Sequence, residues 1–516
     1  MRIAFPVLLA LLLAGLFVEA YLAIKPAIHV VIVSAAAVGL FLFCLTTPHR
    51  RAMGWRTMVI ATAMPTLAWS LGNIWLLFAL LGIGVPLIAR SFAMIVPVYL
   101  FSLLLLPGLD TAVMIGPLKL FDCSTLDALA WGASIAIFLD KRKARPSIHH
   151  DVAACAIILL IGAALARDTS FSNLLRSSTN VVIDLGLPYY IVSRGVRTLE
   201  EVRAAMLWIG CGAVTVATLL LYELGKSWPI YNVLYSDYHL PTLLIVKERA
   251  GYLRAAGPFM EPTSAAMVLA ICILCLWLCR AFFRSAWHHL LLLVVTMVGL
   301  FAPQSRGAWV GLILGMVLAE LFRGRFLSVI RKGAVVAAGV VLLLLAASVS
   351  PNVSESIGLS GDSSDSTDYR RMLLDRGMEV FLERPLLGYS VPELQIRLAD
   401  LRQGEGIIDF VNTYIWILLM TGIGGLAIFL APFLYYMHAI WRRRRAMLGT
   451  HEMREAATFL FACLAMTLEM LFFNSFGTRP AVFVFLLFGL STAFLGSVRA
   501  EARASSRPHS PVLAAA

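Results

Sequence analysis

Apolar runs of about 20 residues recur along almost the whole chain, and they constrain its fold more than any other feature. A helix needs about 20 apolar residues to cross the hydrocarbon core of a bilayer. Runs of this kind lie near residues 3–24, 27–46, 57–82, 86–106, 118–139, 150–166, 176–193, 203–224, 259–279, 286–303, 305–322, 329–349, 411–436, 455–474 and 478–498. Hydrophobic residues make up 60% of the chain and charged residues only 14%. The sequence therefore predicts an all-α, polytopic membrane bundle of about 12–14 transmembrane helices.

Positive charge between these runs predicts how the bundle is oriented. The net charge is +12, and much of it lies in short connections at 141–145, 194–203, 280–289, 323–332 and 441–445. These connections alternate along the chain, so all of them can be cytoplasmic. The opposite side then receives two long loops, 225–257 and 350–410, and two turns, 302–307 and 474–479. Orientation accounts for the basicity, so we expect no nucleic-acid partner.

The first hundred residues fit this pattern less well. The first run is longer than the apolar region of a signal peptide, so we interpret it as a retained span. His49–Arg51 and Arg56 favour the cytoplasm, whereas the number of downstream runs places them outside. One run in this region therefore fails to cross or is split.

Arginines on the non-cytoplasmic side oppose the general bias, and two of them lie next to spans. Arg254 precedes Gly257 and the segment EPTS at 261–264, where Thr263 or Ser264 can cap the next helix and Pro262 suits its first turn. This arginine either extends to the membrane surface or holds an anion at the helix N-terminus.

Arg306 lies in the short turn between two apolar runs. We expect it to face the bundle interior and to pair with an anion. Gly307, Gly311 and Gly315 follow at four-residue spacing, which predicts close helix packing.

The loop 350–410 contains an amphipathic stretch at 369–390. Its apolar residues have helical spacing and predict a helix on the membrane surface that ends at Pro385 and Gly388. Arg370, Arg371 and Arg376 fall on or near its polar side. They contact lipid headgroups or hold a negatively charged substrate.

The stretch GIIDFVNTY at 406–414 places Asp409 and Asn412 directly before a long apolar run that begins at Tyr414. An acid at this position either caps the following helix or takes part in chemistry.

Four segments in this order resemble the O-antigen ligases and polysaccharide polymerases of bacterial inner membranes. They are RAAGPFMEP at 254–262, SRG at 305–307, the arginine-rich helix that ends in PLLGY at 385–389, and VNTY at 411–414 with the glycines of 422–425. Each motif alone is weak, but together they extend the resemblance over roughly residues 90–500. The resemblance implies N-terminal spans at 1–106, a ligase- or polymerase-like membrane domain at 107–498 and a disordered cytoplasmic tail at 499–516.

The resemblance also implies an activity: a metal-independent, inverting glycosyltransferase without cofactor, facing the periplasm. The donor is a polyprenyl-diphosphate-linked oligosaccharide and the acceptor a sugar hydroxyl on another glycan, with a chain-length regulator or other assembly proteins as further partners. Arg254, Arg306, Arg370, Arg371 and Arg376 then hold the diphosphate in place of a metal, with Asn412 and Tyr414 at the substrate site.

One departure from the family pattern concerns the catalytic base. The histidine that family members carry before the asparagine is Val411 here, which cannot accept a proton. Asp409, Glu405 and Glu261 are the carboxylates that can replace it.

The sequence leaves four functions open, in three classes. Polymerisation of exopolysaccharide or O-antigen repeats is the favoured one, because the missing histidine departs from the ligase pattern. The alternative within the same class is ligation of O-antigen onto lipid A core. The alternatives from other classes are a lipid-linked glycan transporter and a non-catalytic assembly protein, although the chain shows no repeated halves of the kind found in many transporters.

Overall fold

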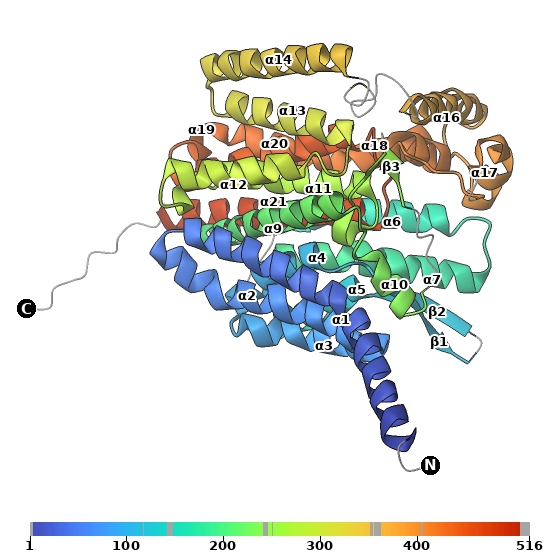
Figure 1. Cartoon of the computed structure of the whole chain (residues 1–516). Coiled ribbons are helices and arrows are strands. Elements are labelled where there is room, and N and C mark those ends of the chain that lie inside the picture. Colours follow the sequence, from blue (N-terminus) through green and yellow to red (C-terminus); the bar gives the residue numbers. More distant parts are fainter. Residues whose placement is uncertain are drawn as a thin grey trace, which may run out of the picture.

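The computed structural model describes residues 4–116, 118–141, 148–240, 246–249, 251–350, 354, 363–403 and 406–505. The described part is a bundle of helices with two small antiparallel hairpins (Figure 1). The first half contains α1 (Ala4–Cys44), α2 (Thr47–Ser70), α3 (Ile74–Ala89), α4 (Phe92–Leu105), β1 (Asp110–Ile115), β2 (Leu118–Ser124), α5 (Thr125–Phe138), α6 (Ile148–Leu165), α7 (Phe171–Val181), the π-helix η1 (Val182–Gly186), α8 (Leu187–Gly195), α9 (Leu199–Lys226) and α10 (Asn232–Asp237).

The second half begins with a short hairpin directly before Arg254. It contains β3 (Glu248–Arg249), β4 (Tyr252–Leu253), η2 (Gly257–Phe259), α11 (Pro262–Leu278), η3 (Arg280–Phe282), α12 (Ala286–Gly299), α13 (Arg306–Phe322), α14 (Phe326–Val349), α16 (Ser363–Glu383), α17 (Val391–Arg397), η4 (Ala399–Leu401), α18 (Thr413–Arg442), α19 (Arg444–Met447), α20 (His451–Met470) and α21 (Thr478–Ser505).

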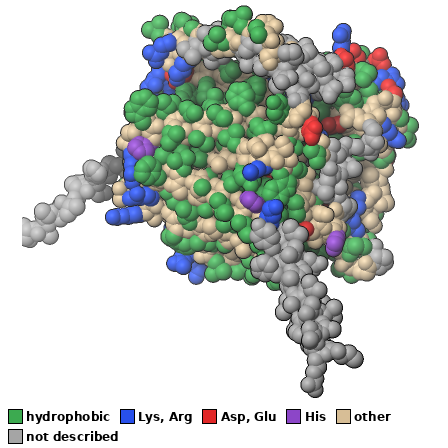
Figure 2. Space-filling view, in the orientation of Figure 1, with side chains coloured by type: hydrophobic (Ala, Val, Ile, Leu, Met, Phe, Trp, Pro, Cys, Tyr) green, Lys and Arg blue, Asp and Glu red, His purple; other side chains and the backbone are tan. Residues whose placement is uncertain are grey.

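The helices confirm the predicted fold class, a polytopic helical membrane protein. Four described segments are long and apolar enough to cross a bilayer: Ile24–Cys44, Leu199–Lys226, Thr413–Arg442 and Arg479–Ala502. Shorter apolar helices accompany them, among them α11 and α12. Figure 2 shows hydrophobic side chains over much of the broad side of the bundle, as a surface in contact with lipid requires.

The described parts of the predicted cytoplasmic connections, at 194–203, 280–289, 323–332 and 441–445, meet at one end of the bundle, which we call the basic end. There Arg203 of α9 pairs with Glu452 of α20, and Arg323 after α13 pairs with Glu455. The long loops and turns of the other side meet at the opposite end, which we call the loop end. Ala255 N–H donates to Ala302 O at 3.1 Å, and the Thr413 hydroxyl donates to Asn474 O at 2.7 Å. The contacts therefore agree with the grouping that the charge pattern predicted.

The N-terminal region corrects two expected boundaries. Residues 3–24 and 27–46 were expected as two runs, but α1 is one helix of 41 residues. With one helix in place of two, His49 reaches the basic end, where its ring lies 4.8 Å from that of Phe282. The run at 118–139 was expected as one span, but residues 118–124 form β2 and the helix begins at Thr125. Ser124 and Asp127 form a capping box that fixes this start.

The turn at residues 385–389 fits into a break in α18. Gly422 has φ 69° and ψ −170°, which interrupts the helix. The freed backbone groups bond to the turn, since Tyr389 N–H donates to Leu419 O at 2.7 Å and Ile423 N–H donates to Pro385 O at 2.9 Å. A Cβ on Gly422 would lie 2.2 Å from Leu386 O. Glycine is therefore required there both by conformation and by space.

Arg167, which follows α6, holds the same turn from the other side. Its guanidinium donates to Leu387 O at 2.7 Å, Met420 O at 2.9 Å and Gly388 O at 3.1 Å. One cation thus bridges the turn and the broken helix, and the backbone of both is fixed by charge-assisted hydrogen bonds.

The amphipathic helix predicted in the long loop is present as α16 and ends before Pro385, but its apolar side is used differently. Leu373 and Val380 are buried in a cluster with Ile415 and Leu419 of α18. A Cβ on Gly377 would lie 3.0 Å from Ile415 Cγ2, so the two helices pack closely. The buried side of α16 therefore faces α18, whereas Met372 and Leu382 remain exposed.

The break in α18 yields a stability prediction. We expect Gly422→Ala to lower the free energy of unfolding by about 1–3 kcal/mol, because alanine is strained at this φ and its methyl group collides with the turn. Gly424→Ala is the matched control, since a Cβ there has no atom within 4 Å. The measurement is thermal unfolding of the purified protein in detergent. Equal unfolding midpoints for the two variants would contradict the docking of the 385–389 turn into the break of α18.

Candidate functional site

Two arginines reach the loop end on the hairpin β3–β4. Arg249 ends β3, and its Nη1 donates to Gln304 O at 2.9 Å. Arg254 directly follows β4, and its Nε donates to Pro303 O at 3.2 Å. Both carbonyls belong to the tight turn between α12 and α13. The hairpin is thereby fixed beside the start of α13.

A buried carboxylate fixes the backbone after Arg254. Glu223 of α9 accepts hydrogen bonds from Gly257 N at 2.8 Å, Ala256 N at 3.2 Å and Ile230 N at 3.1 Å. Gly257 has φ +55°, and a Cβ there would lie 3.1 Å from Leu220 Cδ2. These contacts explain the glycine of the RAAGPFMEP motif. At the start of α11, Pro262 holds the expected first position, but the cap residue is Glu261 and not Thr263 or Ser264.

Arg306 is the first residue of α13, where the helix dipole also favours an anion. The glycines that follow allow α13 to approach α20 closely. A Cβ on Gly307 would lie 2.8 Å from Phe473, and one on Gly315 would lie 2.7 Å from Met466 Sδ. The predicted packing role of the glycine stripe is confirmed. It holds the N-terminus of α13 against the end of α20.

Arg370 extends toward the same place from α16. Its guanidinium carbon lies 5.9 Å from the ring centroid of Phe473, the residue that Gly307 packs against. We call Arg249, Arg254, Arg306 and Arg370 the arginine cluster.

The four charges of the arginine cluster act on one another. Burial and then the neighbouring charges of Arg249, Arg370 and Arg306 lower the pKa of Arg254 to about 10, with Glu261 opposing them. The pKa of Arg249 is lowered by burial and then by Arg306 and Arg370. The pKa of Arg370 is lowered by burial and by Arg306, with Asp409 opposing. Like charges that destabilise one another in a partly buried place favour a multivalent anion between them.

Asp409 lies beside this cluster and is held through its backbone. The Tyr369 hydroxyl donates to Asp409 O at 3.1 Å and accepts from Asp409 N at 3.1 Å. Tyr369 directly precedes Arg370, and the Asp409 carboxylate interacts electrostatically with Arg370. The carboxylate is thus placed next to a cation of the cluster.

The residue that caps α18 shows whether Asp409 has a capping role. Asn412 is the cap residue, and its side chain accepts from Tyr414 N at 2.9 Å and Ile415 N at 3.3 Å. Asp409 therefore does not cap α18. Tyr414 donates from its hydroxyl to Leu468 O and stacks at 4.3 Å on Phe472. The Asn412 and Tyr414 side chains thus fix the first turn of α18, so both residues have a structural role.

The other predicted site residues lie in different surroundings. Glu261 pairs with Lys247 at 3.1 Å, and its side chain is half-exposed. Arg371 is exposed. Arg376 is exposed and pairs with Glu379 at 2.7 Å and Asp400 at 3.4 Å, which raise its pKa. Glu405 lies outside the described residues.

Two residues were not assigned to the site from the sequence. Arg249 was one of several cations on the loop side, and only the hairpin brings it to the cluster. Glu469 near the end of α20 lies against α13, because a Cβ on Gly311 would lie 2.7 Å from its Oε2. Both of its carboxylate oxygens are buried and have no hydrogen-bond partner among the described residues. The run 455–474 begins at Glu455, and an acid as far inside it as Glu469 is the signal that could have identified this residue.

The fold and the arginine cluster together describe a multi-pass membrane protein with a group of four arginines at one end of its helix bundle. Residues 290–430 match the family model described as O-Antigen ligase. Arg306, Arg370, Asp409 and the glycine break of α18 all lie inside the match. Glycan transfer of the ligase or polymerase type is the activity of this family. No curated protein matches the chain.

The arginine cluster predicts selective binding of a multivalent anion. We expect inorganic pyrophosphate to raise the unfolding midpoint of the purified protein more than sodium chloride at equal ionic strength, because bound anion stabilises the folded state. Arg306→Gln removes one of the four charges and should reduce this stabilisation several-fold. Arg376→Gln is the control, since Arg376 already pairs with two carboxylates. An equal response of both variants would contradict the cluster as the binding site.

Proposed function

We propose that the chain transfers glycan from a polyprenyl-diphosphate-linked donor to a sugar hydroxyl, and that this transfer polymerises exopolysaccharide or O-antigen repeats. The observation that carries this proposal is the convergence of Arg249, Arg254, Arg306 and Arg370 from the hairpin, α13 and α16. The O-Antigen ligase match over residues 290–430 supports the same reaction class.

The arginine cluster suits a diphosphate leaving group. In the proposed step the acceptor oxygen attacks the anomeric carbon of the donor, and the bond between that carbon and the diphosphate oxygen breaks. A single displacement of this kind inverts the anomeric centre. Negative charge grows on the departing diphosphate, and guanidinium groups already held in place stabilise it without reorganisation.

Asp409 is the proposed base for the acceptor hydroxyl. Asp409 lies at the edge of the arginine cluster, next to Arg370. Hydrogen bonds to Tyr369 fix its backbone, and it does not cap α18. A carboxylate within reach of the attacking hydroxyl can take its proton as the new bond forms. Val411 stands where the resembled ligases carry histidine, and this difference favours polymerisation over ligation.

The orientation of the reaction follows from charge. The arginine cluster lies at the loop end, and the basic connections lie at the opposite end. Because positively charged connections remain in the cytoplasm, the proposed site faces the periplasm of a bacterial inner membrane.

The test is the glycan pattern of a strain that lacks the chromosomal copy and expresses variants. We expect Arg306→Ala and Asp409→Asn each to give single repeats in place of long chains, with a fall in transfer of about 10²–10⁴-fold for the loss of the base. Arg376→Ala should keep long chains. The glycans are separated by size on gels, and membrane levels of each variant are compared.

Other patterns would assign a different function. Unchanged chain length and yield in both Arg306→Ala and Asp409→Asn would overturn the enzymatic proposal. Free long chains with nothing on lipid A core would identify a ligase. Lipid-linked repeats trapped on the cytoplasmic side would identify a transporter.

Glu469 provides a separate test of the base. Glu469→Gln keeps the shape of the buried side chain and removes its charge, so we expect it to retain polymerisation within about tenfold if Asp409 is the base. Long chains in Asp409→Asn together with single repeats in Glu469→Gln would identify Glu469 of α20, and not Asp409, as the proton acceptor.

A further inference from the structure

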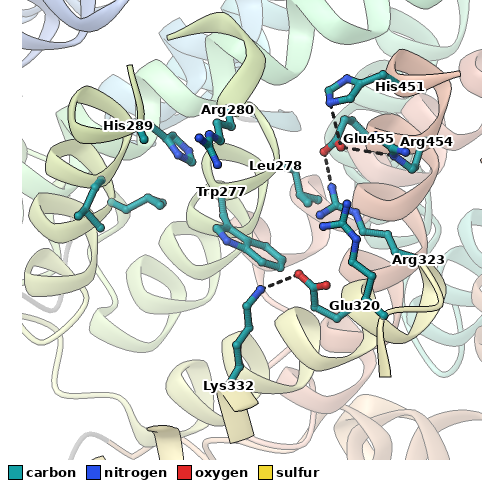
Figure 3. Close-up of a pocket in the computed structure, with 14 residues that line it drawn as sticks. Trp277, Leu278, Arg280, His289, Glu320, Arg323, Lys332, His451, Arg454 and Glu455 are labelled. Carbon is teal, nitrogen blue, oxygen red and sulfur yellow. Dashed lines mark hydrogen bonds and ion pairs between the residues drawn. The ribbon is translucent and has the colours of Figure 1, made fainter. Parts of the chain in front are cut away.

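A cavity of about 490 Å³ opens at the basic end, far from the arginine cluster. It lies between the ends of α11, α12, α13, α14 and α20 (Figure 3). Arg306 begins α13 and Arg323 directly follows the same helix of 17 residues, so the two sites are separated by roughly 25 Å at 1.5 Å per residue. The cavity is therefore not part of the proposed transfer site.

Cations outnumber carboxylates around this cavity. Its positive side chains are Arg280, Arg323, Arg325, Lys332 and Arg454, and its carboxylates are Glu320 and Glu455. His289 and His451 add two imidazoles. The lining thus keeps an excess of positive charge after both acids are counted.

The existing ion pairs do not satisfy all of these groups. Glu320 accepts from Lys332 at 2.6 Å, and Glu455 pairs with Arg323. The Arg323 side chain is only 9% exposed, yet its Nε has no hydrogen-bond partner among the described residues. Arg280 and Arg325 are exposed, and neither guanidinium has an ion-pair partner in the described part of the chain. A buried donor without a partner and two available guanidinium groups suit an incoming anion.

Apolar side chains form the remaining wall and the rim. Trp277 lies between the charged groups, with Lys332 Nζ 4.6 Å and the Arg323 guanidinium carbon 5.8 Å from its ring centroid. Trp287 follows the lining residue Ala286 and is 78% exposed, and Leu327 lies two residues after the lining residue Arg325 and is 82% exposed. A ligand that is charged at one end and apolar along its length can occupy both environments at once.

We propose that this cavity binds the phosphate headgroup of an anionic phospholipid, with the acyl chains along the exposed apolar residues of α12 and α14. Basic pockets between membrane helices on the cytoplasmic side are suited to such headgroups. The phosphate accepts from the exposed guanidinium groups of Arg280 and Arg325, next to the Arg323–Glu455 pair. A soluble phosphate shares the headgroup chemistry but would gain nothing from the apolar rim.

The experiment measures lipid binding to the full-length protein in detergent by native mass spectrometry and thermal unfolding. We expect phosphatidylglycerol to bind and to raise the unfolding midpoint, with little effect from phosphatidylcholine or inorganic phosphate at the same concentration. The double variant Arg280→Gln with Arg325→Gln should weaken phosphatidylglycerol binding roughly tenfold or more. Both residues are exposed, so folding is preserved.

The matched control removes the same charge from the same end. Arg442→Gln with Arg445→Gln changes two exposed arginines outside the cavity and should leave affinity within about twofold. Equal weakening by both double variants, or equal binding of phosphatidylcholine, would overturn the site. If inorganic phosphate raises the unfolding midpoint as much as phosphatidylglycerol does, the ligand is a soluble phosphate and the lipid proposal is wrong.

Discussion

The docking of the 385–389 turn into the break of α18 is the contact on which the proposed site depends. Tyr389 N–H donates to Leu419 O and Ile423 N–H donates to Pro385 O. Arg167 donates to carbonyls of both the turn and the broken helix. This contact fixes the C-terminal end of α16 against a membrane helix. Because α16 is rigid and packs along α18, Arg370 is carried to the N-terminus of α13. A flexible loop would not hold a cation at a fixed place.

The arginine cluster is a second constraint, because its members repel one another. Hydrogen bonds to the carbonyls of Pro303 and Gln304 hold Arg254 and Arg249 in spite of this repulsion. The free energy of keeping four guanidinium groups together is offset when an anion binds among them. A diphosphate held there in the proposed reaction would therefore stabilise the folded protein.

Helix α13 joins the two charged ends of the bundle. Its N-terminus carries Arg306, and its C-terminus leads into Arg323 beside the cavity of the basic end. Gly307, Gly311 and Gly315 press the whole helix against α20. Close packing of this kind leaves no room for a larger side chain between the two helices.

The sequence by itself determined the class of fold and the grouping of the loops at one end, and it selected Arg254, Arg306 and Arg370 as candidate site residues. These follow from apolar run length and from charges that oppose the positive-inside bias, which are local properties. Only the tertiary structure decided that Arg249 joins the cluster and that Asn412, not Asp409, caps α18. It also decided that Arg376 forms ion pairs with Glu379 and Asp400. Residues 3–46 were also misread as two runs, since helix continuity across Lys25 and Pro26 depends on packing. Contacts between segments far apart in the chain depend on how helices pack, and run length and charge carry no such information.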